Sequence, residues 1–137
     1  MAFTPEKAQK FLSDAFAGWI QDLNLTVTEI DIDVAVLTMP ITPHLTRMGG
    51  IICGQSLASM ADTAMVMATA AHYGEPRPVA TTTLDTHFLR PGVGDTVQCT
   101  ARIVRAGRSL LFAQAKMIAL PSSKEIATAT ATFFLAD

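Results

Sequence analysis

Residues 48–74, MGGIICGQSLASMADTAMVMATAAHYG, decide how the rest of the chain is interpreted. The segment is strongly apolar and has the composition of a helix. It nevertheless contains one carboxylate, Asp62, and no other fixed charge lies between Arg47 and Glu75. The sequence therefore predicts one long helix in which a single acidic side chain needs an explanation.

Small side chains recur at helical spacing along this segment, at Ala61, Ala64, Ala68 and Ala71. A stripe with so little bulk allows a sheet to approach the helix backbone closely. Near the end of the chain, small side chains repeat at period two instead, at Ala127, Ala129 and Ala131. We therefore expect an α+β fold in which a curved antiparallel sheet wraps tightly around a central helix.

The remaining segments predict one more helix and several strands. Residues 4–23 form an expected peripheral amphipathic helix, with Thr4 as its cap and Pro5 in its first turn. Residues 25–40 predict two short strands with a turn at 31–33. Alternating segments bounded by Gly, Pro or Ser then predict the four strands of an antiparallel meander, at residues 78–91, 94–106, 109–120 and 125–136.

Composition limits the class of protein. With 137 residues the chain is most simply one domain, 1–137, with residues 1–23 as its peripheral N-terminal part. Half of the residues are hydrophobic and only 16% are charged, which excludes disorder and suggests a subunit interface. No run of Lys and Arg indicates a nucleic-acid partner. Residues from 77 onward carry 7 basic and 4 acidic side chains, a balance that suits an anionic ligand.

Cysteine usage and the N-terminus indicate the compartment. Cys53 and Cys99 have neither metal-ligand nor CxxC spacing, so no metal site and a reducing compartment are expected. The first residues, MAFTPEKAQKF, lack the basic and apolar regions of a leader. The expected location is cytoplasmic, with no membrane partner.

Asp62 has no basic side chain three or four places away on its own helix. A carboxylate in this position must reach solvent, a partner from another segment or a substrate, because a buried and unpaired charge costs several kcal/mol. It is therefore either a structural residue, at a solvent-facing edge or capping another segment, or a general base or nucleophile.

Gly49, Gly50 and Gly54 cluster where the predicted helix begins. Free backbone N–H groups at a helix start stabilise negative charge that develops on an oxygen. Gly54 precedes Asp62 by a little over two turns, so both are expected to border one cleft, an arrangement that suits acyl hydrolysis. The alternative is that these glycines merely form turns.

Three segments resemble a known family: CGQSLASMADTA at 53–64, TLDTHFLRPGVGDTV at 83–97 and ARIVRAGRSLLFAQAKM at 101–117. They are similar to the PaaI-type acyl-CoA thioesterases of the hotdog fold, over about His44 to Phe134. The resemblance implies a long helix wrapped by an antiparallel sheet. It also implies subunits that join their sheets and share active sites, in a homodimer or a homotetramer.

The resemblance also implies roles for particular residues. Asp62 matches the catalytic carboxylate of the family, and Gly54 matches the residue whose backbone N–H polarises the thioester carbonyl. A polar residue near the start of the next strand, which helps to place water, falls at Thr81 or its neighbours Thr82 and Thr83. Basic residues at strand ends that would meet the phosphates of coenzyme A are Arg90, Arg105 and Arg108.

The chain departs from the family at the helix entrance. Where members usually have His-Gly-Gly, this sequence has Cys53, Gly54 and Gln55, and the usual loop Asn or Gln falls on Arg47, or on Thr46 with a gap of one residue. Gln55 is either a further donor to the carbonyl or a helix-surface residue. Cys53 is either a nucleophile or an inert thiol.

The sequence therefore predicts a thioester hydrolase acting on acyl-CoA with an apolar or aromatic acyl group, without metal or organic cofactor. Asp62 acts as general base or as nucleophile, and both remain open. Helix and interface side chains such as Leu57, Met60 and Met65 are expected to line the acyl pocket. The alternatives are a noncatalytic acyl-CoA binding or sensing protein and, with less support because Cys53 replaces the needed histidine, a dehydratase or hydratase.

Overall fold

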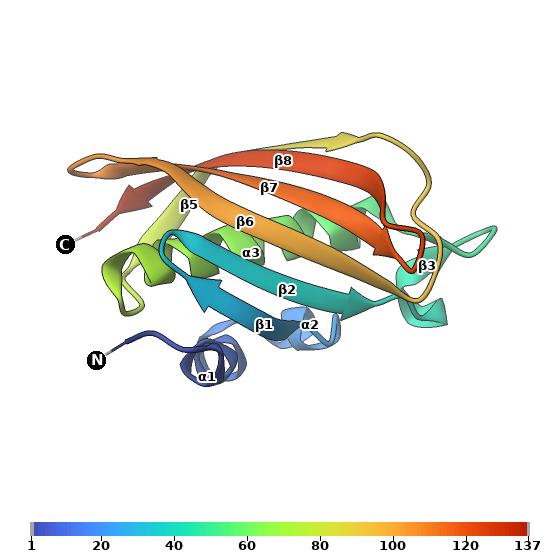
Figure 1. Ribbon diagram of the computed structural model, residues 1–137, viewed down its shortest axis with the longest axis horizontal. Coiled ribbons are helices and arrows are strands. Elements are labelled where there is room, and N and C mark those ends of the chain that lie inside the picture. The colour runs from blue at the N-terminus through green and yellow to red at the C-terminus, as the bar shows by residue number, and fades with distance from the viewer. Residues whose placement is uncertain (1, 137) are drawn as a thin grey trace.

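One long helix lies against a six-stranded antiparallel sheet that curves around it (Figure 1). This computed structural model describes residues 2–136. The helix is α3 (Gly54–Tyr73), and the strand order in the sheet is β1-β2-β6-β7-β8-β5. The strands are β1 (Thr26–Asp31), β2 (Val34–Pro40), β5 (Val79–Phe88), β6 (Thr96–Ala106), β7 (Leu110–Leu120) and β8 (Lys124–Leu135).

Shorter elements lie around this frame. The helices α1 (Pro5–Ala15) and α2 (Gly18–Gln21) lie beyond the β1 side of the sheet (Figure 1). Between β2 and α3 come the 3-10 turn η1 (Pro43–Leu45) and a small ladder of β3 (Thr46–Arg47) with β4 (Ile51–Ile52). No helix within residues 2–136 has the length and apolar character needed to cross a membrane.

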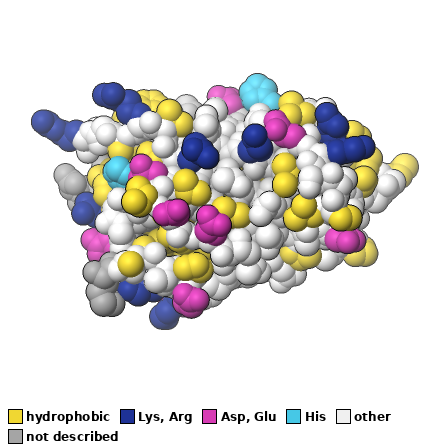
Figure 2. Space-filling model, viewed as in Figure 1, with side chains coloured by type: hydrophobic (Ala, Val, Ile, Leu, Met, Phe, Trp, Pro, Cys, Tyr) yellow, Lys and Arg dark blue, Asp and Glu magenta, His cyan; other side chains and the backbone are white. Residues whose placement is uncertain are grey.

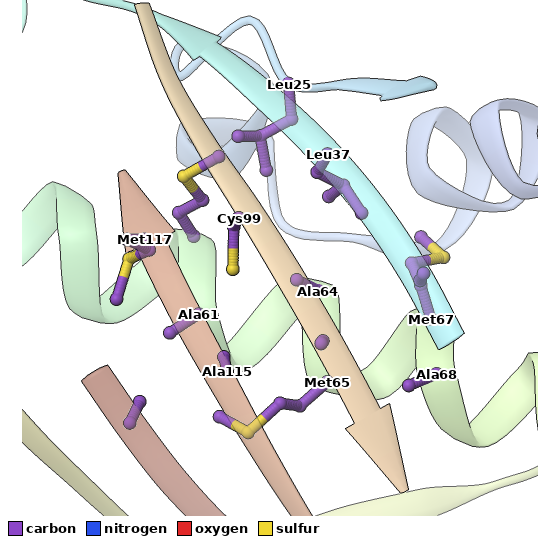
Figure 3. Packing of buried hydrophobic residues seen from close by; sticks show 14 of the residues in the cluster. Leu25, Leu37, Ala61, Ala64, Met65, Met67, Ala68, Cys99, Ala115 and Met117 are labelled. Atoms are coloured by element: carbon purple, nitrogen blue, oxygen red, sulfur yellow. The ribbon is translucent and has the colours of Figure 1, made fainter. Parts of the chain in front are cut away.

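The predicted alanine contact between helix and sheet is confirmed. Ala61, Ala64 and Ala68 have no exposed surface and lie on the side of α3 that faces the sheet (Figure 3), whereas the fourth predicted alanine, Ala71, is partly buried. The sheet presents small side chains in return, including Ala115 and Cys99. The three predicted alanines of β8 are buried as well, namely Ala127, Ala129 and Ala131. Longer methionine side chains fill the remaining space, as they do in many cores.

The order of the strands differs in one respect from the expected meander. Strands β6, β7 and β8 are neighbours in chain order, but β5 pairs with β8 and lies at the edge of the sheet. Alternation of apolar and polar residues determines which face of a strand is buried, but it does not determine which strand lies beside it. The expectation that β5 would lie next to β6 was therefore wrong.

The N-terminal segment forms two helices rather than the single expected helix. Thr4 caps α1 as predicted, since its side chain accepts a hydrogen bond from the N–H of Lys7. At Phe16 the backbone becomes extended, and the ring packs edge-on against Phe11 with centroids 5.4 Å apart. Gln21 donates to the carbonyl of Leu12, which also accepts the N–H of Phe16, and to the carbonyl of Phe16. These contacts end the first helix.

Candidate active site

Asp62 meets Thr81 where the middle of α3 faces the start of β5. The hydroxyl of Thr81 donates a hydrogen bond to Oδ1 of Asp62, at 2.9 Å. Thr81 pairs across the ladder with Phe133, which is fully buried, so its side chain points to the helix side of the sheet. The structure thus brings together two residues proposed for catalysis that are 19 positions apart in the sequence.

Burial and this hydrogen bond act in opposite directions on the carboxyl group. Desolvation raises the pKa of Asp62, and the bond from Thr81 lowers it by a smaller amount. Within residues 2–136 no basic side chain forms a salt bridge with Asp62. A half-buried carboxylate without a cationic partner, held by a neutral hydroxyl, has the properties expected of a general base or nucleophile.

The start of α3 offers backbone donors. No acceptor in the described part of the chain takes the N–H of Gly54, and the cap residue Cys53 makes no side-chain cap bond. A Cβ at position 54 would lie 3.2 Å from Cζ of Phe88, so a glycine allows this ring to lie against the helix start. By contrast, Gly49 and Gly50 have φ of +89° and +73° and serve the turn between β3 and β4.

A hollow of about 390 Å³ opens at this end of α3. It brings together four of the residues expected to contact substrate or carbonyl: Arg47, Gly54, Leu57 and Arg90. Apolar walls come from Phe88 and the loop that follows β5. In that loop, a Cβ at Gly92 would lie 2.6 Å from Cγ2 of Ile52, so only glycine fits there.

Asp62 does not line this hollow. Eight residues of helix separate Gly54 from Asp62, and at 1.5 Å per residue this amounts to about 12 Å along the axis. A carbonyl oxygen lies about 3 Å from its donor, and the attacking oxygen about 3 Å from the carbonyl carbon. One carbonyl therefore does not reach both groups of the same chain, and the expected single cleft is not formed within one subunit.

Several predicted residues lie apart from the Asp62–Thr81 pair. Thr82 sits at an irregularity in the ladder and donates to the carbonyl of Thr132, and Thr83 pairs with Thr132 on the outer face. Met60 and Met65 are fully buried in the core and line none of the described hollows. Because both side chains are buried, neither can contact a substrate within one subunit.

The remaining residues of the helix entrance have modest surroundings. Thr46 donates to the carbonyl of Pro43, which fixes the turn before β3. The thiol of Cys53 is 3.4 Å from the hydroxyl of Ser56. No histidine accompanies that thiol among its hydrogen-bond partners, and a base of this kind is what a cysteine nucleophile needs. Gln55 is exposed on the first turn of α3.

Arg105 and Arg108 lie at the opposite end of the molecule. They flank the turn between β6 and β7, which is closed by a bond from Gly107 N–H to the carbonyl of Leu110. Figure 2 shows basic side chains at the end of the molecule where Figure 1 places this turn. Within one subunit these arginines are remote from Gly54, whereas Arg47 and Arg90 are beside it.

Phe88 also contributes to this site, although it is not among the predicted site residues. It belongs to the FLRP motif, and its ring is 54% exposed although it contacts Gly54. A large exposed aromatic ring beside a tight glycine is a feature of recognition surfaces. No group of three His, Cys, Asp or Glu side chains in residues 2–136 is arranged to hold a metal ion.

Comparisons with known proteins identify the family and the fold. The family model described as the thioesterase superfamily matches residues 49–125, which include α3, β5, β6 and β7. Comparison with curated protein sequences gives no significant match.

Solved structures share the fold over nearly the whole chain. A conserved protein of Pseudomonas aeruginosa is 26% identical, with a TM-score of 0.81, covering 88% of this chain and 95% of its own. A thioesterase of Haemophilus influenzae is 19% identical, with a TM-score of 0.88, covering 100% and 93%. The PaaI protein from the phenylacetic acid degradation operon of E. coli is 22% identical, with a TM-score of 0.83, covering 98% and 97%. The expected hotdog fold is confirmed.

Proposed function

The chain belongs to the thioesterase superfamily, and from this premise we propose that it hydrolyses acyl-CoA thioesters at a site shared between two subunits. The observation that carries the proposal is the pair formed by Asp62 and Thr81, together with the free N–H of Gly54. These are a proton acceptor and an oxyanion donor, the two groups that acyl transfer to water requires.

The separation of about 12 Å between Gly54 and Asp62 supports a site built by two copies of the chain. β5 is an edge strand, so a second copy can pair with it. Antiparallel pairing of two β5 strands about a two-fold axis brings the start of one against the end of the other. The start lies beside Asp62, and the end, at Phe88, lies beside Gly54. We therefore propose a homodimer with two equivalent sites.

In the proposed reaction, the carbonyl oxygen of the thioester accepts a hydrogen bond from Gly54 N–H of one subunit. The carboxylate of Asp62 from the other subunit takes a proton from water, and the water oxygen attacks the carbonyl carbon. The tetrahedral intermediate then collapses, the C–S bond breaks, and the proton held by Asp62 passes to the leaving thiolate.

In the other route, the carboxylate of Asp62 attacks the carbonyl carbon itself. The thiolate leaves, and water hydrolyses the resulting anhydride. Both routes use the same carboxylate in nearly the same place, and both remain proposals. Thr81 orients the carboxylate in either case.

Basic side chains support coenzyme A as the thiol half of the substrate. Arg47 and Arg90 line the hollow beside Gly54, where they are able to bind phosphate. In the proposed dimer, the two-fold axis reverses the second subunit end for end. Arg105 and Arg108 of the second subunit would therefore lie near the end of the first subunit that carries Gly54. A homotetramer and a cytoplasmic location stay predictions from the sequence.

The proposal is tested by hydrolysis of a panel of acyl-CoA thioesters, with released thiol as the readout. We expect turnover by the wild-type protein and a loss of about 100-fold to 10,000-fold in Asp62→Asn, because removing a general base has effects of this size. Asp22→Asn is the matched control, since Asp22 is an exposed carboxylate after α2 and lies away from β5. Unchanged turnover in Asp62→Asn would remove that residue from the mechanism.

The departure at Cys53 favours a second candidate, an acyl-CoA binding or sensing protein without turnover. The same panel separates the two functions. Saturable binding of acyl-CoA by the wild-type protein, with no thiol released from any member of the panel, would establish the binding function and exclude hydrolysis.

A further inference from the structure

A second hollow lies between α1, the middle of α3 and the start of β5. Its volume is about 420 Å³, and its walls are mainly apolar. The side chains that form it include Phe11, Ala15 and Phe16 from the N-terminal segment, Val66 from α3, and Pro78 and Val79 before and at the start of β5. We call this hollow the α1 groove.

The α1 groove lies next to the Asp62–Thr81 pair. Val66 is four residues after Asp62, one turn further along the same face of α3. Val79 is two residues before Thr81, on the same face of β5. Both elements that carry the catalytic pair therefore continue directly into the groove wall, and a group attached to a carbonyl carbon at Asp62 can extend into it.

We propose that the α1 groove binds the apolar acyl group of the thioester substrate. This inference rests on the proposed function, and it replaces the expected pocket of Leu57, Met60 and Met65. Met60 and Met65 are fully buried and leave no room in the core for an acyl chain, whereas Leu57 lines the hollow beside Gly54, which does not include Asp62. The groove offers open apolar surface that includes Val66, one helical turn beyond Asp62.

The chemistry of the walls indicates the class of acyl group. Phe11 and Phe16 present an edge-to-face aromatic pair with ring centroids 5.4 Å apart, which suits a straight alkyl chain or an aryl ring. No carboxylate lines the groove, and its one charged residue, Arg77, has its guanidinium over the ring of Tyr73 at 4.8 Å. A polar or charged acyl group would find few partners here. We therefore expect a preference for unsubstituted apolar acyl groups.

The origin of the groove walls has a consequence for specificity. Phe11, Ala15 and Phe16 lie outside residues 49–125, the part of the chain that matches the thioesterase superfamily. The part that carries Asp62 and Gly54 would thus supply the chemistry, and the N-terminal helix would select the acyl group.

A series of straight-chain acyl-CoA substrates tests the groove. Burial of each methylene favours binding by about fourfold, so kcat/KM should rise by up to about this factor per added carbon until the groove is filled, and then level off. Val66→Trp and Ala15→Phe fill the groove from its two walls. We expect each to lower the ratio of kcat/KM for octanoyl-CoA to that for acetyl-CoA by at least about tenfold.

Val104→Trp is the matched control for added bulk. Val104 is on β6 outside the groove and is 60% exposed, so this variant should leave the ratio as in the wild-type protein. Ala15 is exposed on α1, so Ala15→Phe is expected to fold even where Val66→Trp does not. An unchanged ratio in folded Ala15→Phe, beside active wild-type protein, would overturn the groove and leave the hydrolase intact.

A binding measurement separates the groove from the hydrolysis. S-octyl-CoA and S-ethyl-CoA are thioethers that cannot be hydrolysed, and their affinities can be compared by calorimetry. We expect the wild-type protein to prefer the octyl ligand and Ala15→Phe to lose that preference. If this result is obtained while no thioester is hydrolysed, the groove stands and the proposed hydrolysis fails. Equal affinity of the wild-type protein for the two ligands would overturn the groove.

Discussion

The two edges of the sheet differ in how their backbone groups are satisfied. At the β1 edge, the side chain of Gln9 from α1 acts as a short substitute for a strand. Its Nε2 donates to the carbonyl of Leu25 at 3.0 Å, and its Oε1 accepts from the N–H of Val27 at 2.8 Å. The chain therefore covers its own first edge with a helix, which is one of the known ways to protect a sheet from pairing with other chains.

Within residues 2–136, no side chain or helix covers the β5 edge in this way. It is ten residues long, and nearly all of its side chains are exposed. Leu89 donates to the carbonyl of Ile126 on the β8 side, so strand alternation turns the N–H groups of Thr86 and Phe88 toward the free edge. The chain itself therefore covers the β1 edge, whereas the β5 edge is available for pairing with a second copy.

The largest expected effect comes from variants that inactivate the two halves of the shared site. Asp62→Asn removes the carboxylate, and Gly54→Pro removes the N–H donor at a helix position that tolerates proline. We expect each variant alone to lose at least about 100-fold in kcat. Mixed subunits should recover about a quarter of wild-type activity, since half of the dimers then contain one intact site.

Gly54→Ala is the matched control for this experiment, because it adds the same contact with Phe88 and keeps the N–H. Both variants and their mixture are assayed after unfolding and refolding together. If the mixture is no more active than its components, the site does not combine Gly54 of one subunit with Asp62 of the other.

The second prediction concerns pairing of two subunits at the β5 edge. Thr86→Pro removes an N–H that faces the free edge while leaving the bonds between β5 and β8 in place. Two such losses per dimer, at about 1 to 1.5 kcal/mol each, should weaken dimerisation by about 30-fold to 150-fold. Sedimentation velocity measures the change in mass. Thr86→Val keeps the N–H and should sediment as the wild-type protein does; equal masses for all three would locate the interface elsewhere.

The third prediction concerns the side chain that covers the β1 edge. Gln9→Ala leaves the N–H of Val27 and the carbonyl of Leu25 without their partner. We expect the free energy of unfolding to fall by about 1 to 3 kcal/mol, as measured in urea. Gln9→Glu keeps the acceptor for Val27 and should lose less than Gln9→Ala. Equal stability of all three proteins would mean that the two hydrogen bonds contribute nothing to protecting this edge.

The smallest expected effect concerns pH. Burial raises the pKa of Asp62, and the bond from Thr81 partly opposes this, so Thr81→Val should move the acidic limb of the rate profile to higher pH. Thr83→Val, on the outer face of β5, is the control. A limb at the same pH in Thr81→Val and in the wild-type protein would show that the hydroxyl does not act on this carboxyl group.

The raised pKa of Asp62 also affects how the stability of the fold depends on pH. Because the pKa of Asp62 is higher in the folded chain than in the unfolded chain, the folded state binds more protons between the two values. Stability contributed by this group therefore falls as pH rises through that window, and the loss remains above it. Asp62→Asn should accordingly be at least as stable as the wild-type protein at neutral pH, by urea unfolding.

Much of the frame can be predicted from the sequence because local patterns determine it. The alanines at helical spacing in α3 and at period two in β8 predict a helix in close contact with a sheet, and all of them are buried except Ala71, which is partly buried. The partner of β5 cannot be predicted in this way, because alternation does not specify a neighbouring strand. The break after α1 also escapes prediction, since it depends on the contact of Phe16 with Phe11 and on the bond from Gln21.

The site is predictable to a similar extent. Asp62 stands out as a lone charge, and Gly54 as a glycine at a helix start. Their meeting with Thr81 and Phe88 depends on how α3 lies over β5, which no local pattern determines. The α1 groove needs the same tertiary information, because its walls come from three separate parts of the chain.

The alanine contact between α3 and the sheet restricts how this protein can change over evolutionary time. A larger side chain at Ala61, Ala64 or Ala68 would push the helix away from the strands along their common length, so such changes would be removed by selection. New substrate preferences are more easily acquired in parts that do not touch this contact. The first sixteen residues are one such part, and homologues should diverge there first.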